Sequence, residues 1–358
     1  MIHIVLGTRA QLIKMAPVMR ALQREDIPYN FIFTGQHQDT IEELRKSFKI
    51  KEPDVTLYRG QDIVSIASMI VWSIRILFKT LFTKKEIFKN DREGIVIVHG
   101  DTISTLLGAL MGKLSGLKVG HVESGLRSFK LFHPFPEELT RIATFALCDY
   151  FFCPGEWAVN NVKKYAGKKI NTRMNTLFDS LQWAVQNLNQ IGVTIPQERY
   201  CVISIHRYEN VNTRNNLTHI IRTVEKIAER LRVLFVLHPI TEKKLHSYGF
   251  YCRMQDNAHV ELLPRYSYFQ FIRLLHGSEF MVTDGGSNQE ECSYLGKPCL
   301  LLRKATERQE GLDKNVCLSH MKDDIISNFI NNYSQFSLPH LQEEVTPSSI
   351  IVRAIKEL

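Results

Sequence analysis

Short apolar runs alternate with longer helical patterns along almost the whole chain, and this alternation limits the fold to a small class. Strands rich in Val, Ile and Phe are expected in the first half at His3–Leu6, Asn30–Thr34, Ile95–His99, Lys118–Val122 and Tyr150–Cys153. Helical patterns lie between them at Gln11–Arg24, Asp39–Phe48, Ile63–Phe82 and Thr102–Leu114. Strands that are apolar along their whole length are typical of parallel sheets covered by helices on both faces. The pattern therefore predicts an α/β fold.

The second half repeats this organisation. Strands are expected at Cys201–Ile205, Val233–Leu237, Val260–Leu263, Phe280–Thr283 and Cys299–Leu302, with helices near Thr213–Glu229, Tyr268–Leu275 and Gln289–Leu295. A chain of 358 residues is long enough for about two domains. We expect two doubly wound, Rossmann-like domains that face a cleft, over residues 1–170 and 178–345, with the seam in the polar stretch Lys168–Asp179. A final helix within 346–358 could return to the first domain.

The net charge indicates which kind of partner the chain binds, and the cysteine content indicates the cellular compartment. Lys and Arg number 45 against 37 Asp and Glu, and the net charge of +8 favours an anionic partner, whether a phosphate-bearing substrate, an acidic membrane surface or a nucleic acid. The basic residues are dispersed and no nucleic-acid reader motif occurs, so we expect no nucleic-acid partner. The seven cysteines form no C-x-x-C pair, and Met1–Leu6 resembles a first strand rather than a signal peptide. A cytoplasmic protein with reduced cysteines is expected.

Residues 63–89 form the most apolar segment of the chain. Arg75 and Lys79 interrupt it, and two cations inside a span make membrane insertion costly. One stripe at helical spacing comprises Ile63, Ile66, Ala67, Ile70, Ile74, Leu77, Phe78 and Leu81. This stripe favours a core or dimer-interface helix, and peripheral membrane contact through residues 63–89 stays open as the second interpretation.

Polar clusters follow many of the expected strands. They are Gly7–Arg9, Thr34–His37, His99–Thr102, His121–Arg127, His206–Asn210, His238–Pro239 and Thr283–Gly286. In open parallel sheets, ligands bind outside the carboxyl ends of the strands. Seven such clusters indicate one binding cleft.

The stretch from Phe280 to Gln289 has the pattern of a phosphate site. An apolar strand is followed by Gly285-Gly286-Ser287-Asn288 and then by a helix. Free backbone N–H groups at such a helix start favour an anion, with Arg9, Lys14 and Arg308 as candidate cations, although the glycines could merely form a tight turn. The G-x-G-x-x-G fingerprint and the P-loop are both missing, which disfavours pyridine-nucleotide redox chemistry and P-loop ATP hydrolysis.

Three acids and one histidine are candidates for proton transfer. Asp101 and Glu123 follow adjacent expected strands, and Glu137 enters a predicted helix. Acids that converge on a phosphate-binding cleft can supply general acids and bases, whereas a single Glu could equally be a solvated surface residue. His206 ends another buried strand and is a candidate proton carrier or phosphate partner. No metal-ligand spacing occurs, so neither a metal nor a cofactor is expected.

Taken together, these motifs resemble the UDP-N-acetylglucosamine 2-epimerase family. The resemblance rests on motifs that occur in family order: Gly7-Thr8-Arg9 with Ile13-Lys14-Met15-Ala16-Pro17, Thr34-Gly35-Gln36-His37, His99-Gly100-Asp101-Thr102, His121-Val122-Glu123-Ser124-Gly125-Leu126-Arg127, Pro134-Phe135-Pro136-Glu137-Glu138 with Arg141, His206-Arg207-Tyr208-Glu209-Asn210, Thr283-Asp284 with Gln289-Glu290-Glu291, Gly296-Lys297-Pro298, and Thr306-Glu307-Arg308. It implies a two-domain, glycosyltransferase-B-like fold, often a homodimer, in which the second domain holds most of UDP.

The motifs around Glu123 and Glu137 resemble the non-hydrolysing branch, with Ser124 in place of an alanine. This branch interconverts UDP-N-acetylglucosamine and its manno epimer by elimination and re-addition of UDP, without a redox cofactor. The resemblance implies acid/base roles for Asp101, Glu123 and Glu137, with His206 assisting at the phosphates. The implied substrate-binding set is Arg9, Lys14, Arg141, His238, Gly285, Gly286, Ser287, Glu291 and Arg308, with Glu291 on the ribose hydroxyls.

Three departures from the family pattern leave other interpretations open. Ala10-Gln11 replaces a Pro-Glu pair, Gly285-Gly286-Ser287 replaces S-G-G, and Gln309 replaces a proline. These changes are compatible with a modified sugar or with altered activity. The alternatives are a hydrolysing 2-epimerase that releases free N-acetylmannosamine, a glycosyltransferase of the same fold, and a non-catalytic sugar-nucleotide binder.

Overall fold

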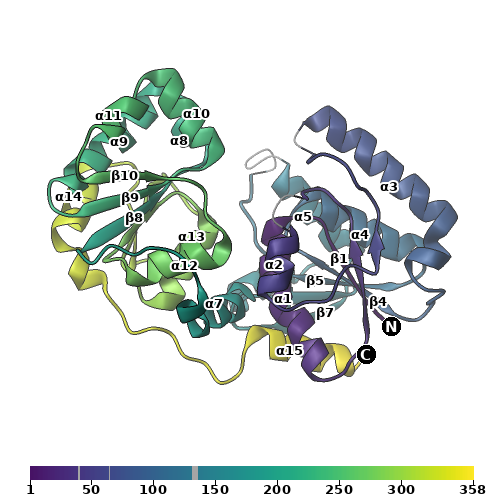
Figure 1. Cartoon of the computed structure of the whole chain (residues 1–358). Helices are drawn as coiled ribbons and strands as arrows, with labels where there is room; N and C mark the ends of the chain where they lie inside the picture. Colours follow the sequence, from purple (N-terminus) through teal and green to yellow (C-terminus); the bar gives the residue numbers. More distant parts are fainter. Residues whose placement is uncertain (39–40, 64, 131–135) are drawn as a thin grey trace. The chain divides into compact units, whose positions relative to one another are not determined.

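The computed structural model in Figure 1 describes residues 1–38, 41–63, 65–130 and 136–358. The chain divides into two compact units. Unit 1 comprises Met1–Ser180 together with Glu344–Leu358, and unit 2 comprises Leu181–Glu343. Each unit is built around its own parallel sheet.

Unit 1 contains a seven-stranded sheet in the order β3-β2-β1-β4-β5-β6-β7, in which all neighbouring strands are parallel. The strands are β1 Ile2–Leu6, β2 Tyr29–Phe33, β3 Val55–Thr56, β4 Ile95–His99, β5 Lys118–Val122, β6 Tyr150–Cys153 and β7 Lys168–Asn171. Successive strands are added on one side of β1 and then, from β4 onward, on the other. The carboxyl ends of β1 and β4 therefore form a topological switch point, where doubly wound sheets bind ligands.

The helices of unit 1 connect these strands. They are α1 Arg9–Arg24, α2 Ile41–Ser47, α3 Ile66–Ile87, α4 Ile103–Leu114, α5 Glu137–Leu147, α6 Glu156–Asn161, α7 Leu177–Gln186, which crosses into unit 2, and α15 Pro347–Lys356. Helix α15 packs against α1, where Lys356 Nζ lies 2.8 Å from Glu25 Oε2. The last helix of the chain is thus part of the first unit (Figure 1).

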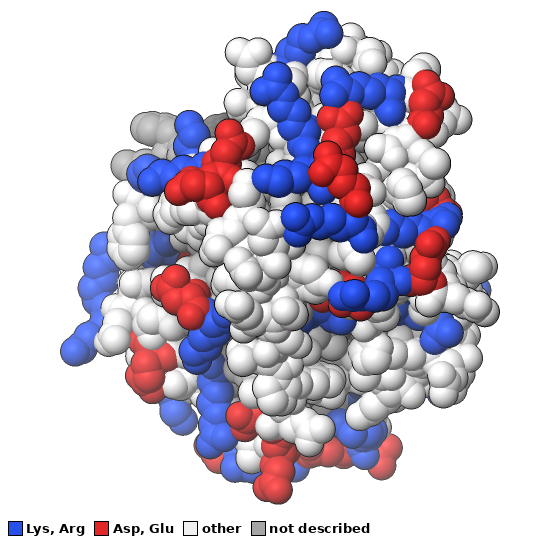
Figure 2. Space-filling view, turned by 90° about the vertical axis from the view of Figure 1, so that its left-hand side faces the viewer, with Lys and Arg blue, Asp and Glu red and all other residues white. Residues whose placement is uncertain are grey.

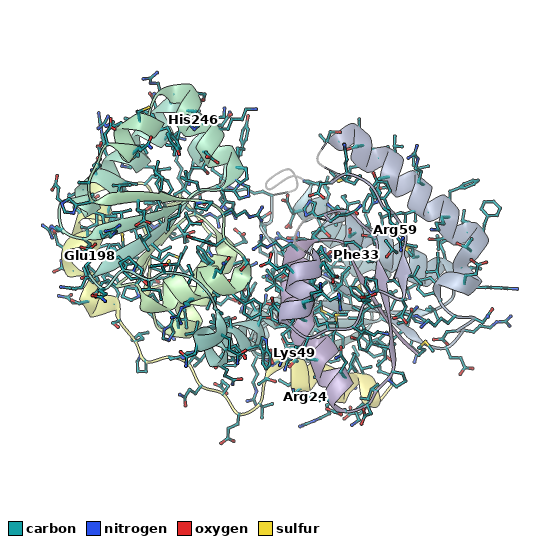
Figure 3. The ribbon with its side chains drawn as sticks, viewed as in Figure 1. Arg24, Phe33, Lys49, Arg59, Glu198 and His246 are labelled. Atoms are coloured by element: carbon teal, nitrogen blue, oxygen red, sulfur yellow. The ribbon has the colours of Figure 1, made fainter. Side chains whose placement is uncertain are left out.

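Unit 2 contains a six-stranded parallel sheet in the order β10-β9-β8-β11-β12-β13. Its strands are β8 Tyr200–Ser204, β9 Arg232–Val236, β10 Val260–Leu263, β11 Met281–Thr283, β12 Cys299–Leu301 and β13 Val316–Leu318. Its helices are α8 Tyr208–Val211, α9 Arg214–Ala228, α10 Pro239–Tyr248, α11 Tyr251–Gln255, α12 Tyr268–Gly277, α13 Gly286–Leu295 and α14 Asp323–Asn332, with short 3-10 turns at Leu188–Gln190 and Tyr333–Phe336. The switch point lies between β8 and β11. Apolar side chains from strands and helices fill the interior of the unit (Figure 3).

The predicted α/β class with two doubly wound parallel sheets is confirmed. Within the expected seam Lys168–Asp179, the first residues Lys168–Asn171 form the edge strand β7. Its side chains are exposed or only partly buried, so the segment is polar like a linker although its backbone pairs with β6. Edge strands tolerate lysines that a central strand would exclude.

The face of helix α3 that is buried is not the face that was predicted. Its buried side chains are Trp72, Ile76, Thr80 and Ile87, whereas most of the predicted stripe faces outward. The helix is apolar almost all round, so its periodicity could not distinguish the two faces. By length and composition, α3 is also the one helix in the described ranges that could cross a membrane.

Surface charges are mixed. Figure 2 shows cationic and acidic side chains interspersed on one face of the molecule rather than gathered into a single basic patch. The seven cysteines are all free thiols, and most of them are buried.

Candidate active site

Glu123 lies at the carboxyl end of β5 in a buried polar pocket of unit 1. Its Oε1 accepts hydrogen bonds from Lys14 Nζ at 2.5 Å and from Asn175 Nδ2 at 2.6 Å. Its Oε2 lies 3.3 Å from His99 Nε2. The backbone of Glu123 has a φ of 62°, an uncommon conformation for a residue with a side chain. The buried carboxylate lies beside Lys14, which compensates its charge.

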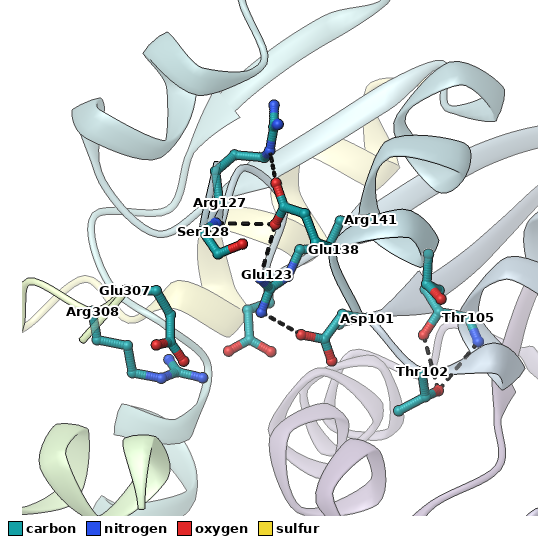
Figure 4. A network of polar contacts seen from close by, with 12 residues as sticks. Asp101, Thr102, Thr105, Glu123, Arg127, Ser128, Glu138, Arg141, Glu307 and Arg308 are labelled. Atoms are coloured by element: carbon teal, nitrogen blue, oxygen red, sulfur yellow. Dashed lines mark hydrogen bonds and ion pairs between the residues drawn. The ribbon is translucent and has the colours of Figure 1, made fainter. Parts of the chain in front are cut away.

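Asp101 belongs to the loop that follows the neighbouring strand β4. Its Oδ2 accepts a 2.5 Å bond from Arg141 Nη2, and its side chain is 29% exposed (Figure 4). The register that pairs His99 with Val122 brings this loop beside Glu123. A Cβ added to Gly100 would lie only 3.4 Å from Glu123 Oε2. Two predicted acids therefore lie on adjoining loops, one buried and one accessible.

Arg141 is oriented by a second carboxylate, Glu138, that the sequence analysis did not single out. Arg141 Nη1 donates to Glu138 Oε2 at 3.2 Å, and Arg127 Nε donates to Oε1 at 2.5 Å. The backbone N–H of Ser128 also donates to Oε2, at 3.0 Å (Figure 4). Burial by itself raises the pKa of Glu138, but these three donors outweigh it and leave the pKa below its usual value. A charged Glu138 thus fixes the arginine that holds Asp101.

Glu137 is the first residue of α5, as its position in the motif predicted, and it is partly buried. It precedes Glu138 by one residue, so its side chain leaves the helix roughly 100° away from that of Glu138. Pro134 and Phe135 of the same motif lie outside the described residues. The structure therefore places Glu137 at the start of α5, one residue before the carboxylate that orients Arg141.

His121 lies on β5, two residues before Glu123, and has a structural role. Its Nε2 lies 2.7 Å from the carbonyl oxygen of Gly100, and its ring is 1% exposed. Burial lowers the pKa of His121 to about 4, against the opposing influence of Gly100, Glu123 and Asp101. The ring is neutral near neutral pH, and its N–H ties β5 to the loop that carries Asp101.

Gln11 is one of the departures from the family pattern, and its side-chain amide both accepts and donates hydrogen bonds. Its Oε1 accepts from the N–H groups of Gly7 and Thr8 at 2.9 and 3.1 Å and completes the capping box of α1. Its Nε2 donates to the His99 carbonyl at 2.8 Å and to Thr105 Oγ1 at 2.9 Å. A carboxylate could provide the cap but not these two donated bonds. Gln11 therefore joins the loops after β1 and β4.

Asp284 organises the corresponding switch point in unit 2, although its role was not predicted. It is fully buried after β11, and its carboxylate accepts from the backbone N–H groups of His206 and Arg207, both at 3.0 Å. Asn210 Nδ2 donates to the same carboxylate at 2.9 Å. Arg207 Nε donates a 2.9 Å hydrogen bond to the Asp284 carbonyl oxygen. The loop after β8 is thus fixed against the loop after β11.

His206 is held by this network but remains accessible, with its side chain 39% exposed. Burial lowers the pKa of His206, while Asp284, whose Oδ1 lies 3.4 Å from His206 Nδ1, opposes the change. The His238 ring lies with its centroid 5.5 Å from that of His206. Two predicted site histidines are therefore brought together at the ends of β8 and β9.

The predicted phosphate turn leads directly into α13. Gly285 is the N-cap and Gly286 the first residue, and this fully described helix has neither an acidic residue in its first turn nor a side-chain cap. A Cβ on Gly286 would lie 2.7 Å from Arg308 Nε, so a side chain at this position would displace the guanidinium. Arg308 is in turn paired with the buried carboxylate of Glu290. These features leave a helix start suited to an anion, with Ser287 as the second residue of the helix.

The remaining predicted residues lie close to these two groups. Glu291, on α13, is buried, and its Oε2 accepts from Asn288 Nδ2 at 2.8 Å. Arg9 is the first residue of α1 at the switch point of unit 1. No cluster of three or more potential metal ligands occurs within the described part of the chain. Unit 1 thus gathers the acids and unit 2 the candidate anion site.

A family model described as UDP-N-acetylglucosamine 2-epimerase matches residues 20–346. The chain belongs to the UDP-N-acetylglucosamine 2-epimerase family. An epimerase of Methanococcus maripaludis is 33% identical over 332 residues, covering 88% of this chain and 86% of the relative. The Bacillus subtilis epimerase is 33% identical over 321 residues, covering 86% and 80%. The resemblance inferred from the motifs is confirmed, and the chain is an epimerase-like enzyme.

Solved structures agree with this assignment. The Neisseria meningitidis epimerase bound to UDP-GlcNAc gives a TM-score of 0.82 at 26% identity and covers 100% of both chains. The Methanocaldococcus jannaschii epimerase, in complex with UDP-GlcNAc and UDP, gives 0.78 at 25% identity, covering 100% of this chain and 99% of that one. Acinetobacter baumannii MurG, with a TM-score of 0.57 and 10% identity, covers 100% of this chain and 99% of its own and shares the fold alone. The epimerase family and MurG therefore share the glycosyltransferase-B-like architecture found here.

The residues that the sequence analysis missed have one property in common. Asp284 and Glu138 are both fully buried. Each accepts hydrogen bonds from neighbouring side chains and backbone N–H groups of the chain instead of facing solvent. Their motif positions, directly after Thr283 and Glu137, were the available signal. That signal could not identify the donors, because Asp284 binds residues 74 to 78 positions away in the chain.

Proposed function

We propose that this enzyme interconverts UDP-N-acetylglucosamine, or a modified relative, and its manno epimer without releasing free sugar. The observation that carries the proposal is the pair of carboxylates on adjoining loops of unit 1. Glu123 is buried beside Lys14, and the more exposed Asp101 is held by Arg141. Epimerisation at carbon 2 needs a proton removed from one face and delivered to the other, which one carboxylate in a single position cannot do.

The proposed reaction is redox-neutral. A base takes the proton from carbon 2, the electron pair forms a double bond to carbon 1, and the bond from carbon 1 to the diphosphate oxygen breaks. UDP leaves with that bond's electrons, adds back to carbon 1, and an acid returns a proton to the opposite face of carbon 2. Asp101, Glu123 and Glu137 are the proposed acid/base set, each contributing on the order of 10²–10⁴-fold.

Unit 2 is proposed to bind the UDP portion. The start of α13 at Gly285 and Gly286 offers backbone N–H groups to the diphosphate, and His206 is accessible at the adjacent strand end. Negative charge grows on the diphosphate as it leaves, so preorganised donors stabilise the transition state more than the ground state. Arg308 and His238 are proposed to assist at the phosphates, and Glu291 to bind the ribose hydroxyls. UDP-GlcNAc and UDP bound to the Methanocaldococcus jannaschii relative support this substrate class.

Incubation with UDP-N-acetylglucosamine in heavy water, followed by NMR, tests the proposal. We expect deuterium at carbon 2 of both epimers with UDP still attached. Free N-acetylmannosamine together with UDP would instead identify a hydrolysing enzyme. Product that forms only after an acceptor is added would identify a glycosyltransferase, and binding without exchange would identify a sugar-nucleotide binder.

A further inference from the structure

Helix α3 presents an apolar face to the surroundings of unit 1. We define the α3 apolar face as Ile66, Ile70, Ile74, Phe78, Leu81 and Phe82, whose exposed fractions lie between 54% and 73%. The side chains of α3 extend outward from unit 1 in Figure 3. Scattered exposed apolar residues are ordinary, but a continuous row along one helix marks an interaction surface.

The opposite face of α3 anchors the helix to unit 1. Trp72 and Ile76 are each 2% exposed and join the core, and Trp72 Nε1 donates to the Thr34 carbonyl at 3.3 Å. Both strands that flank α3, β3 and β4, belong to the same sheet. The helix therefore lies along the unit, and crossing a bilayer would require it to leave this core.

The charges on α3 are of one sign until its last turn. Arg75, Lys79, Lys84 and Lys85 are all exposed, and no acidic residue occurs on the helix before Glu86. Lys79 and Lys84 also contact backbone carbonyls of Leu57 and Leu114, at 3.4 and 3.2 Å, which keeps them beside the helix. At its carboxyl end, Lys84 and Lys85 line a surface hollow together with Asn90, Asp91, Arg92, Ser115 and Gly116.

We propose that the α3 apolar face docks onto an anionic lipid membrane surface. An amphipathic helix that lies in the membrane interface buries its apolar face among the acyl chains and keeps its cations near the phosphates. The basic residues of α3 match a negative lipid surface in charge. Contact between the α3 helices of two copies would instead bring like charges together, because α3 carries no acid before Glu86.

Vesicle flotation with the full chain tests the proposal. We expect at least tenfold more protein on vesicles of phosphatidylcholine and phosphatidylglycerol than on phosphatidylcholine alone, decreasing with salt. The double variant Ile74→Glu/Phe78→Glu should lose this binding, and Lys84→Gln/Lys85→Gln should weaken it and its salt dependence. Leu338→Glu, at a residue 44% exposed in unit 2, is the matched control and should bind as the parent does.

Circular dichroism and epimerase turnover establish that each variant is folded. Absence of binding to anionic vesicles overturns the proposal, as does equal binding to both kinds of vesicle. If the parent instead forms a dimer that Ile74→Glu/Phe78→Glu dissociates and does not float with vesicles, the α3 apolar face is an interface between copies and the proposal is wrong. These readouts are independent of which sugar nucleotide the enzyme converts.

Discussion

Lys14 Nζ lies 2.5 Å from Glu123 Oε1, and the two side chains are only 6% and 5% exposed. The pair joins α1 to the loop after β5, so it connects two strand ends of unit 1. Attraction between buried charges offsets their loss of hydration only while both partners are present.

Lys14→Met should therefore leave an uncompensated buried carboxylate. We expect a loss of about 3–5 kcal/mol in the free energy of unfolding, measured by urea denaturation. The double variant Lys14→Met/Glu123→Gln should recover part of this loss because it removes the second charge as well. A loss below about 1 kcal/mol for Lys14→Met, the range of exposed ion pairs, would contradict the buried pairing.

Asp101→Asn should reduce turnover while preserving nucleotide binding. The amide cannot exchange a proton as the carboxylate does, and a general acid or base contributes on the order of 10²–10⁴-fold. Exchange at carbon 2 in heavy water measures the first effect, and calorimetric titration with UDP measures the second. Asp256→Asn, at an exposed residue of unit 2, serves as the control. Near-normal exchange in Asp101→Asn would remove Asp101 from the acid/base set.

His121 should make stability depend on pH between about 6.5 and about 4. Burial lowers its pKa to about 4 in the folded chain, so the unfolded chain binds more protons in this interval. The contribution is fully present above pH 6.5 and is lost as the pH falls, by roughly 3 kcal/mol in all. His121→Gln keeps a donor for the Gly100 carbonyl but cannot titrate. Urea titrations at several pH values give the free energy of unfolding as a function of pH. This free energy should change less with pH in His121→Gln than in the parent, and an identical pH dependence would show that His121 is not the group responsible.

Gly286→Ala should weaken UDP binding. The added Cβ would lie 2.7 Å from Arg308 Nε and must displace the guanidinium that Glu290 holds beside the start of α13. We expect about a tenfold rise in the Kd for UDP, which corresponds to about 1.4 kcal/mol. Gly192→Ala is the matched control, because a Cβ there meets nothing within 4 Å. If Gly286→Ala and Gly192→Ala bind UDP with the same Kd, a side chain at position 286 does not disturb the role of Arg308 in UDP binding.

Gln11→Glu should destabilise unit 1 although it restores the acidic residue usual in the family. The carboxylate would face the His99 carbonyl and Thr105 Oγ1, which now accept bonds from Gln11 Nε2. Unsatisfied buried polar groups cost about 1–3 kcal/mol each, so the urea midpoint should fall. Gln255→Glu, at an exposed residue, should leave it unchanged. A stable Gln11→Glu variant would indicate that the two donated bonds contribute little.

The elements that could be predicted are those whose signal is local. The strands Ile95–His99 and Lys118–Val122 were predicted to the residue, because each is a short, largely apolar run followed by a polar cluster. The buried face of α3 and the edge strand Lys168–Asn171 were not, since both depend on which neighbour packs against them.

The same distinction applies to the candidate site. Asp101, Glu123 and His206 could be identified from their positions after apolar strands. The organising roles of Asp284 and Glu138 depend on donors brought close by the folded chain, among them Asn210 and Arg127. Periodicity and spacing carry no information about such partners, because the hydrogen-bonded groups are set by the relative placement of loops.

The return of α15 to unit 1 makes unit 2 an insertion between two parts of one folding domain. During synthesis on the ribosome, Leu181–Glu343 is therefore complete before the residues of α15 have been joined to the chain. Nascent unit 1 therefore lacks helix α15, which packs on α1, until after the whole of unit 2 has been synthesised, whereas unit 2 by then has every strand of its sheet.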